Sequence, residues 1–293
     1  MSLVVDHVTK RFRLRNGLKS SSLTAVDNVS FTLEPGKTIA LVGESGSGKS
    51  TIAKMILKLE NPTEGAIEID GLDSRVRGAR AKDYRNHVQM VFQDPFASLN
   101  PFHSIAHHIE RPLRLHGKAS SRQEEQEQVK ELLERVNLTP AAEFARRRPH
   151  ELSGGQRQRV AIARALAPGA QYLIADEPVS MLDVSIRLSV LNLLARLQRE
   201  DNLGVLYITH DLATARHFSD EIMVLYRGKV VERGPSDEVI LNPRHKYTKL
   251  LLSAAPEPSN HGKLRDSVRA ELAAGGDLDR DRFGTKDVLL EDS

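Results

Sequence analysis

Residues 38–50 read TIALVGESGSGKS, and this stretch determines the predicted fold. Its first five residues, Thr38–Val42, form the apolar run that is typical of a buried strand. The helical periodicity of Ser50–Leu59 begins directly after the glycine-rich stretch. The sequence therefore predicts a strand, a glycine-rich loop and a helix in immediate succession.

The loop Gly43–Ser50 fits the pattern G-x-x-x-x-G-K-S/T, and the strand and helix that this pattern requires stand on either side of it. Its glycines allow successive backbone N–H groups to turn toward one anion, and the start of the helix adds the positive end of its dipole. Lys49 can reach terminal phosphates and Ser50 can ligate Mg²⁺. We predict a site for a nucleoside triphosphate with Mg²⁺.

Strands and helices alternate outward from this loop, and nearly all the strands are apolar, which is typical of a parallel sheet covered on both faces. The predicted strands are Leu3–Arg15, Ala25–Leu33, Gly65–Ile69, Val88–Phe92, Tyr172–Ala175, Gly204–Ile208, Ile222–Tyr226 and Lys229–Glu232. The predicted helices are Ser50–Leu59, Gln123–Val136, 149–166, Val184–Glu200, a short helix capped by Ser236, and Pro243–Ala255.

Three features of this pattern concern the organisation of the chain. The polar stretch Asn16–Ser22 predicts a surface loop that joins the first two strands into an antiparallel hairpin. Ser98–Pro112 is rich in Pro and His and is expected to be irregular or short-helical, within an inserted helical region. From Ser259 onward, 14 of 35 residues are charged, so we expect a separate charged tail over residues 256–293, in which Leu264, Val268 and Leu272 can form one amphipathic helix.

Composition excludes several classes of protein. The chain has 293 residues, of which 40% are hydrophobic and 28% charged, as in an ordinary folded protein. Its formal net charge of +3 is too small for a protein that coats nucleic acid. It has no cysteine, which excludes disulfides, thiolate nucleophiles and cysteine-ligated metal sites. We find no apolar run long enough to span a bilayer and no secretion signal, so we expect a cytoplasmic location.

Two carboxylates end the apolar run Leu173–Glu177. A buried parallel strand delivers side chains at its carboxyl end to the ligand crevice of the sheet. Asp176 can therefore join the coordination shell of Mg²⁺, and Glu177 can orient or deprotonate a water aimed at the terminal phosphate.

A second candidate anion site lies at Leu152–Gln156, which reads LSGGQ. Ser153 and Gln156 form a capping box that opens a helix, a role that needs no ligand. The two glycines after Ser153 nevertheless leave backbone N–H groups bare at a helix start. One nucleotide does not easily need two such sites from one chain.

Six motifs in order make residues 3–255 resemble the ATP-binding subunits of ABC transporters. Gly43–Ser50 resembles the Walker A loop, Gln93 the Q-loop glutamine and Leu152–Gln156 the signature motif. Tyr172–Asp176 with Glu177 resembles Walker B and its catalytic glutamate. The remaining two motifs resemble the D-loop, at Ser180–Asp183 with Met181 where Ala is more usual, and the switch histidine, at His210.

The resemblance implies an ABC-type P-loop NTPase: an α/β fold with a mainly parallel core sheet, an antiparallel β subdomain and an inserted helical subdomain at about residues 94–167. It implies head-to-tail pairing, in which ATP on one Walker A loop is covered by the partner's signature motif. It implies catalytic roles for Glu177, His210 and Gln93, and magnesium ligation by Ser50, Gln93 and Asp176. The implied nucleotide-binding residues are Gly43, Glu44, Ser45, Gly46, Ser47, Gly48, Lys49, Ser50, Thr51, Ser153, Gly155, Gln156 and Phe12, the last of which is equally well a core residue.

A narrower resemblance, to the oligopeptide and dipeptide importer branch, rests on Gln93–Pro101 and Asn242–Leu251. It implies a second ATP-binding subunit, identical or related, two membrane permeases, an extracytoplasmic substrate-binding protein and a peripheral location on the cytoplasmic side of the inner membrane. Some relatives carry a C-terminal cysteine cluster that this chain lacks, so no iron–sulfur site is expected. We interpret His103, His107, His108 and His116 as solvated or permease-facing rather than metal-binding.

The leading hypothesis is thus an ATPase subunit of a peptide-type ABC importer, with ATP and Mg²⁺ as its cofactors. One alternative is an ABC ATPase that acts on nucleic acid or ribosomes. It is disfavoured because the chain has one phosphate loop rather than a tandem pair and because residues 94–101 fit a permease-docking segment, so no nucleic-acid partner is expected. The other alternative, a regulatory module without turnover, is disfavoured by the intact Glu177 and His210.

Overall fold

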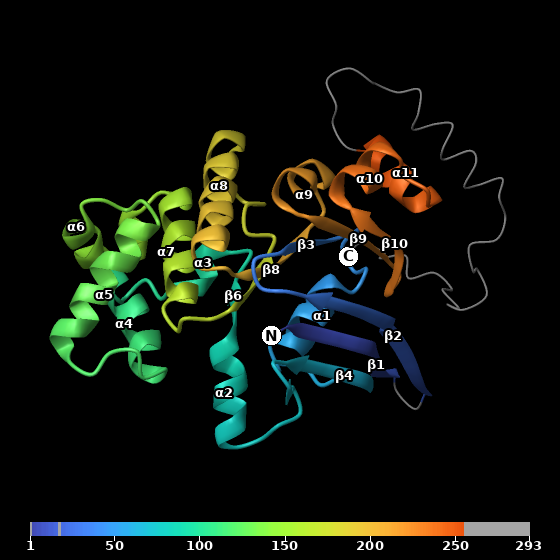
Figure 1. The fold of residues 1–293 in the computed structure, drawn as a ribbon, viewed down its shortest axis with the longest axis horizontal. Helices are drawn as coiled ribbons and strands as arrows, with labels where there is room; N and C mark the ends of the chain where they lie inside the picture. The colour runs from blue at the N-terminus through green and yellow to red at the C-terminus, as the bar shows by residue number, and fades with distance from the viewer. Residues whose placement is uncertain (1, 17–18, 255–293) are drawn as a thin grey trace, which may run out of the picture.

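The computed structural model describes residues 2–16 and 19–254, so the predicted tail at 256–293 lies outside the described residues. Two sheets form the described fold (Figure 1). The larger has the strand order β10-β9-β3-β8-β7-β6, with β3 at Thr38–Val42, β6 at Val88–Val91, β7 at Tyr172–Asp176, β8 at Gly204–Thr209, β9 at Glu221–Tyr226 and β10 at Lys229–Pro235. Five of its strands run parallel and only the edge strand β10 is antiparallel, as the apolar runs predicted.

The smaller sheet is antiparallel, in the order β2-β1-β4-β5, with β1 at Leu3–Asn16, β2 at Lys19–Leu33, β4 at Glu64–Ile69 and β5 at Leu72–Asp73. The predicted hairpin is confirmed, but the loop prediction for Asn16–Ser22 is wrong. Residues 19–22 continue β2 and pair with residues 13–16 of β1. Their polarity misled the prediction, because the backbone pairing of a hairpin does not require apolar side chains.

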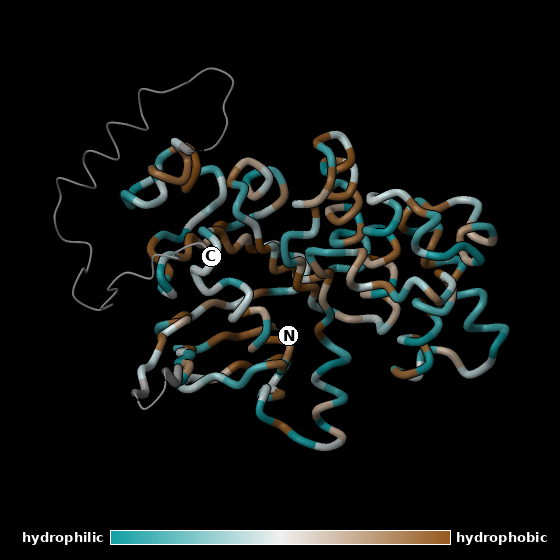
Figure 2. The backbone as a smooth tube through the Cα atoms, turned by 180° about the vertical axis from the view of Figure 1, so that it is seen from behind, coloured by the Kyte–Doolittle hydropathy of each residue, from teal (hydrophilic) through white to brown (hydrophobic). Residues whose placement is uncertain are grey.

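The helix α1, at Lys49–Ile56, lies between the two sheets. Its buried residues Ile52, Met55 and Ile56 belong to one apolar cluster with side chains of both sheets, such as Val5 of β1 and Leu41 of β3. This packing holds the start of α1, and with it the glycine-rich loop, between the sheets. In Figure 2 the strands around this helix include many brown, hydrophobic stretches.

Most of the other helices before β7 gather at one end of the molecule, away from the antiparallel sheet (Figure 1). They are α3 at Pro95–Ser98, α4 at Ile105–Leu115, α5 at Arg122–Arg135, α6 at Ala141–Arg146, the 3₁₀ helix η1 at Pro149–Glu151 and α7 at Gly154–Leu166. The helix α2, at Ala79–His87, precedes β6 and is mostly teal, or hydrophilic, in Figure 2. The amphipathic helix predicted at Gln123–Val136 is confirmed as α5.

The expectation that Ser98–Pro112 is irregular or short-helical is wrong in its second half, where α4 makes three turns. Ser104 caps the helix by accepting a hydrogen bond from the backbone N–H of His107. Ile105, Ile109 and Leu113, spaced four apart, are buried against the neighbouring helices. This apolar stripe stabilises the helix despite Pro112 in its interior.

The remaining helices are α8 at Val184–Glu200, α9 at Leu212–Phe218, α10 at Ser236–Leu241 and α11 at Lys246–Ala254. The prediction that Ser236 caps α10 is wrong: Pro235 occupies the cap position, and the hydroxyl of Ser236 donates to the carbonyl of Ser219. The last helix begins at Lys246 rather than Pro243. Within residues 2–16 and 19–254, we find no helix of the length and apolar character that crossing a bilayer requires.

Candidate functional site

The glycine-rich loop is held in place by contacts that only glycine permits. Gly48 has a φ of 112°, and a Cβ there would lie 2.4 Å from the carbonyl oxygen of Ala25. A Cβ on Gly43 would lie 2.2 Å from the carbonyl oxygen of Leu225. The loop therefore fits tightly between β2 and the end of β9, and its backbone is available to a ligand on the opposite side.

Lys49 is buried within the loop. Its Nζ donates hydrogen bonds to the carbonyl oxygens of Gly43, at 2.6 Å, and of Glu44, at 2.8 Å. Burial lowers the pKa of this ammonium, and the nearby carboxylates of Glu177 and Asp176 oppose the shift. The side chain therefore folds back onto the loop, where its ammonium group can form hydrogen bonds to terminal phosphates.

Glu177 follows β7 in a left-handed backbone conformation, with a φ of 44°, and its N–H donates to the carbonyl of Ile208. Its Oε2 accepts a hydrogen bond from Nε2 of Gln93 at 3.0 Å. Its Oε1 lies 3.2 Å from Nδ1 of His210. The structure therefore brings together the three residues predicted as catalytic, from the ends of β6, β7 and β8.

Asp176 is the last residue of β7. Burial raises the pKa of its carboxyl group, and a hydrogen bond with the side chain of Ser50 opposes that rise. A cation beside this carboxylate would favour its charged form. Asp176 and Ser50 are thus neighbours at the carboxyl edge of the sheet.

A cleft of about 590 Å³ lies over these groups. It is lined by Phe12, Leu23, Ala25, Ser45, Gly46, Gly48, Lys49, Ser50, Thr51, Gln93, Asp176, Glu177 and His210. Of the predicted site residues, those that do not line it are Gly43, Glu44, Ser47, Ser153, Gly155 and Gln156.

Phe12 lies at the edge of the cleft, half-buried, with Nζ of Lys10 at 4.9 Å from its ring centroid. Leu23 is its partner across the β1–β2 pair, and Ala25 follows on the same strand. The motifs did not predict that Leu23 and Ala25 line the cleft. Their place there depends on the register between β1 and β2. Together they give the cleft an apolar edge on which a planar base can lie.

The donor set of the cleft fits Mg²⁺. Mg²⁺ prefers hard oxygen ligands and in nucleotide sites is held by one or two protein groups together with phosphates and waters. The hydroxyl of Ser50 and the carboxylate of Asp176 offer such a pair. Among residues 2–16 and 19–254, no three His, Cys, Asp or Glu side chains are grouped so as to hold a metal by themselves.

The signature-like segment opens α7 and lies apart from this cleft. Ser153 accepts a hydrogen bond from the N–H of Gln156, whose side chain accepts one from the N–H of Ser153, so the predicted capping box is confirmed. Ser153 is exposed and Gly155 is buried. A Cβ on Gly155 would lie 2.5 Å from Cγ2 of Ile186 in α8, whereas one on Gly154 would make an ordinary contact with Leu182 at 3.4 Å. Packing against α8 thus accounts for the second glycine.

This difference makes the two glycines a matched pair. Gly155→Ala is expected to destabilise the chain by about 1–3 kcal/mol, because the added methyl group overpacks the contact between α7 and α8. Gly154→Ala should change the free energy of unfolding by less than about 1 kcal/mol. Denaturant unfolding of the two variants measures both values, and equal stabilities would contradict this packing argument.

The four histidines His103, His107, His108 and His116 lie on or next to α4, and within the described ranges 2–16 and 19–254 they belong to no metal-holding group of three. The rings of His103 and His107 stack at 4.1 Å on the surface of α4 and the residues before it. The interpretation as solvated or permease-facing is wrong for His108, which is buried among the helices. Burial, with the charge of Arg164 nearby, lowers its pKa to about 4. His116 lies apart, with Nδ1 2.5 Å from Oδ1 of Asn86.

Comparison with known proteins gives the family. A family model described as ABC transporter matches residues 26–180, and one described as the C-terminal region of oligopeptide/dipeptide transporters matches residues 231–279. The oligopeptide transport ATP-binding protein AppF of Bacillus subtilis (strain 168) is 47% identical over 281 residues, which cover 94% of this chain and 84% of AppF. The chain belongs to the ABC transporter family.

Further similar proteins and solved structures support the same family assignment. The dipeptide transport ATP-binding protein DppF of Haemophilus influenzae is 46% identical over 267 residues, which cover 90% of this chain and 81% of DppF. The dimeric structure of MJ0796, a bacterial ABC transporter cassette, is 33% identical with a TM-score of 0.69, over 80% of this chain and 98% of that one. The structure of cbiO1 from Clostridium perfringens, part of the ABC transporter complex cbiONQ, is 25% identical with a TM-score of 0.71, over 82% of this chain and 90% of that one.

These matches confirm the family and the importer branch recognised from the motifs. They also confirm the α/β fold class, with its mainly parallel core sheet and its antiparallel sheet. ATP is therefore the nucleotide that this ABC cassette binds. A second structure of the MJ0796 cassette is described as a post-hydrolysis dimer bound to ADP and Pi.

Proposed function

We propose that the chain hydrolyses MgATP for an importer of oligopeptides, dipeptides or related small solutes, as one of two ATP-binding subunits paired head to tail. The observation that carries the proposal is the convergence of Gln93, Glu177 and His210 beside Lys49 in one cleft. The relatives that resemble the chain over most of its length are named as oligopeptide and dipeptide transport ATP-binding proteins, which supports the cargo class.

Glu177 is the proposed general base. Its two oxygens face Gln93 and His210, so the carboxylate has a fixed orientation in the cleft. It accepts a proton as a water oxygen bonds to the γ-phosphorus, while the bond from that phosphorus to the β–γ bridging oxygen breaks to give ADP and phosphate. Gln93 and His210 position the water and the γ-phosphate.

The loop binds the triphosphate. Lys49 exchanges its hydrogen bonds to the Gly43 and Glu44 carbonyls for bonds to the β- and γ-phosphates. Ser50 and Asp176 are the proposed protein ligands of Mg²⁺, with Gln93 near them. Bound Mg²⁺ supplies charge that offsets the negative charge of the phosphates.

Head-to-tail pairing is supported by the position of the signature segment. Ser153 and the N-terminus of α7 do not line the cleft of their own chain, so they are free to cover ATP bound to another subunit. Met181, Val184 and Leu188, near the D-loop and on the first turns of α8, are exposed apolar residues. A partner subunit placed over this region would bury them.

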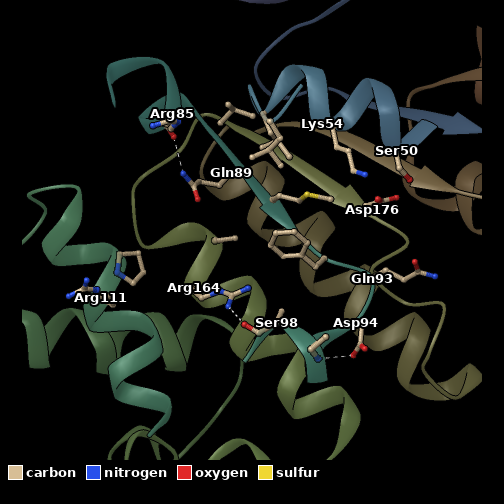
Figure 3. A pocket seen from close by; sticks show the side chains of 18 of the residues that line it. Ser50, Lys54, Arg85, Gln89, Gln93, Asp94, Ser98, Arg111, Arg164 and Asp176 are labelled. Carbon is tan, nitrogen blue, oxygen red and sulfur yellow. Dashed lines mark hydrogen bonds between the residues drawn. The ribbon is translucent and has the colours of Figure 1, made fainter. Parts of the chain in front are cut away.

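A groove of about 850 Å³ adjoins the cleft (Figure 3). Its presence supports the proposal of a permease partner. Ser50, Asp176 and Gln93 line both the groove and the ATP cleft and lie near one another in Figure 3, while Arg111 lies on the opposite side of that view. Most of its wall is apolar, and α1, α2, β6, α4, α7 and the Gln93–Ser98 segment contribute to it. The groove therefore reaches from the catalytic residues to the helical end of the molecule.

We assign this groove to a cytoplasmic helix of a permease. Its exposed apolar side chains, Leu59, Phe92 and Leu115, match the apolar face of an amphipathic helix. Four cationic side chains line it, Lys54, Arg85, Arg111 and Arg164, against two carboxylates, Asp94 and Asp176, so acidic residues on that helix would be complementary. The chain then acts as a peripheral subunit on the cytoplasmic face of the membrane, and the extracytoplasmic binding protein contacts it only through the permeases.

Leu115→Glu tests the groove. We expect the variant to lose at least about tenfold in co-purification with the two permeases, because a charge would face the docked apolar residues. The matched control is Leu241→Glu, since Leu241 on α10 is exposed to a similar extent, 59% against 55% for Leu115, and does not line the groove. Circular dichroism of both variants verifies that they fold. Equal recovery of the permeases with the two variants would refute the docking assignment, and retention of the chain on RNA or DNA instead would refute the importer.

A further inference from the structure

The C-terminal segment of the described chain contacts the phosphate loop directly. Tyr247, on the first turn of α11, is 5% exposed. Its hydroxyl oxygen accepts a hydrogen bond of 3.0 Å from the backbone N–H of Glu44, the second residue of the loop. The two residues are far apart in the sequence, so this contact depends on how α11 is anchored.

The segment before α11 is anchored by backbone hydrogen bonds. The carboxylate of Glu232 in β10 accepts from the N–H groups of Arg244, at 2.7 Å, and His245, at 3.0 Å. Nδ1 of His245 in turn accepts from the N–H of Tyr247 at 3.1 Å. These bonds fix the start of α11 relative to the edge of the core sheet.

The tyrosine ring itself is fixed by a neighbour. Tyr226, at the end of β9, packs on it with ring centroids 4.2 Å apart. Burial raises the pKa of the Tyr247 hydroxyl to about 12, so the group is neutral at physiological pH. The acceptor that faces Glu44 therefore keeps the same protonation state over the working range of pH.

The same side of the sheet holds the loop at two further points. The N–H of Gly228, in the turn between β9 and β10, donates to the carbonyl of Ser47 at 2.9 Å. The carbonyl of Leu225 packs against Gly43. Glu44 does not line the ATP cleft, and its N–H donates to the hydroxyl of Tyr247, which does not line the cleft either.

We propose that Tyr247 is a positioning residue for ATP binding, which holds the first bend of the phosphate loop in the conformation that presents the other N–H groups to the triphosphate. The inference rests on the proposed function of the cleft. It also gives a role to the matched oligopeptide/dipeptide C-terminal region, residues 231–279, within which Tyr247, Glu232 and His245 all lie. In this chain the described part of that region, up to Ala254, braces the ATP site of its own subunit.

Tyr247→Phe tests the proposal, since it removes the hydroxyl oxygen that accepts from the Glu44 N–H and keeps the ring packed on Tyr226. The KM for MgATP of the assembled ATPase, and the affinity of the full-length chain for MgATP, should weaken about fivefold, the loss expected from one such hydrogen bond. The kcat at saturating MgATP should stay within about twofold. Tyr226→Phe is the matched control, because it removes a phenolic hydroxyl from the neighbouring tyrosine and leaves the Tyr247 hydroxyl in place.

A purely structural role predicts a different pattern. It would lower the melting temperature and the active fraction, and hence kcat, while leaving the KM unchanged. Unchanged KM and affinity in Tyr247→Phe, with wild type and Tyr226→Phe binding MgATP normally, would overturn the inference. Failure of the wild-type chain itself to bind MgATP would instead overturn the proposed function. If Tyr247→Phe does not fold, backbone amide exchange in the wild type decides: a protected Glu44 N–H is expected, and exchange as fast as in an open loop would refute the contact.

Discussion

Glu177→Gln is expected to reduce kcat for ATP hydrolysis at least about 100-fold while MgATP still binds. The amide keeps the size of the side chain and can still contact Gln93 and His210, but it cannot accept a proton from the attacking water. Because the loop and Lys49 are untouched, affinity for MgATP should stay within about threefold of wild type. Steady-state phosphate release and equilibrium nucleotide binding measure the two quantities.

The matched control for this variant is Glu131→Gln, which makes the same change at an exposed position on α5. Its kcat should equal that of wild type. Hydrolysis at a normal rate by Glu177→Gln would remove Glu177 from the role of general base, and the convergence of Gln93 and His210 on it would then need another explanation.

Lys49→Ala is expected to weaken MgATP binding about 100-fold. The buried ammonium is the one cation of the loop, and charge-assisted hydrogen bonds to phosphate of this kind contribute about 1.5–3 kcal/mol each. The variant also removes the donor to the carbonyls of Gly43 and Glu44, of which the Glu44 carbonyl keeps a hydrogen bond from the N–H of Ser47. Isothermal titration with MgATP measures the loss.

Lys37→Ala serves as the control for that change, because Lys37 is an exposed lysine close to the start of β3 and outside the cleft. Its affinity for MgATP should match that of wild type. A Lys49→Ala variant that binds MgATP as tightly as Lys37→Ala would contradict this role of Lys49, and the loop would then bind the triphosphate through its backbone alone.

The elements that the sequence predicted well are those in which one local pattern is sufficient. The apolar runs of β3, β7 and β8 read as buried parallel strands, and the loop and carboxylates lie at their ends. The helix α2 was missed because its face toward the protein buries only Ala81 and Tyr84, too few apolar residues to produce a period. The region of α4 was predicted to be only irregular or short-helical, because Pro112 and the histidines outweighed its apolar stripe.

The candidate site divides in the same way. Lys49, Asp176, Glu177 and His210 could be predicted because each stands in a motif whose chemistry is explicit. Leu23 could not, since its place in the cleft depends on the register between β1 and β2. Tyr247 was noted only as part of a branch-specific segment, because its contact with Glu44 spans most of the chain and exists only in the folded protein.

The proposed mechanism requires that ATP is enclosed between two subunits. A crystal structure of the Glu177→Gln variant with MgATP, alone or with its partner subunit, tests it directly. We expect Oγ of Ser153, or of the equivalent serine of the partner, to lie within about 3 Å of a γ-phosphate oxygen of ATP bound to the opposite subunit. A structure in which every such serine lies far from the γ-phosphate of every neighbouring molecule would contradict the account.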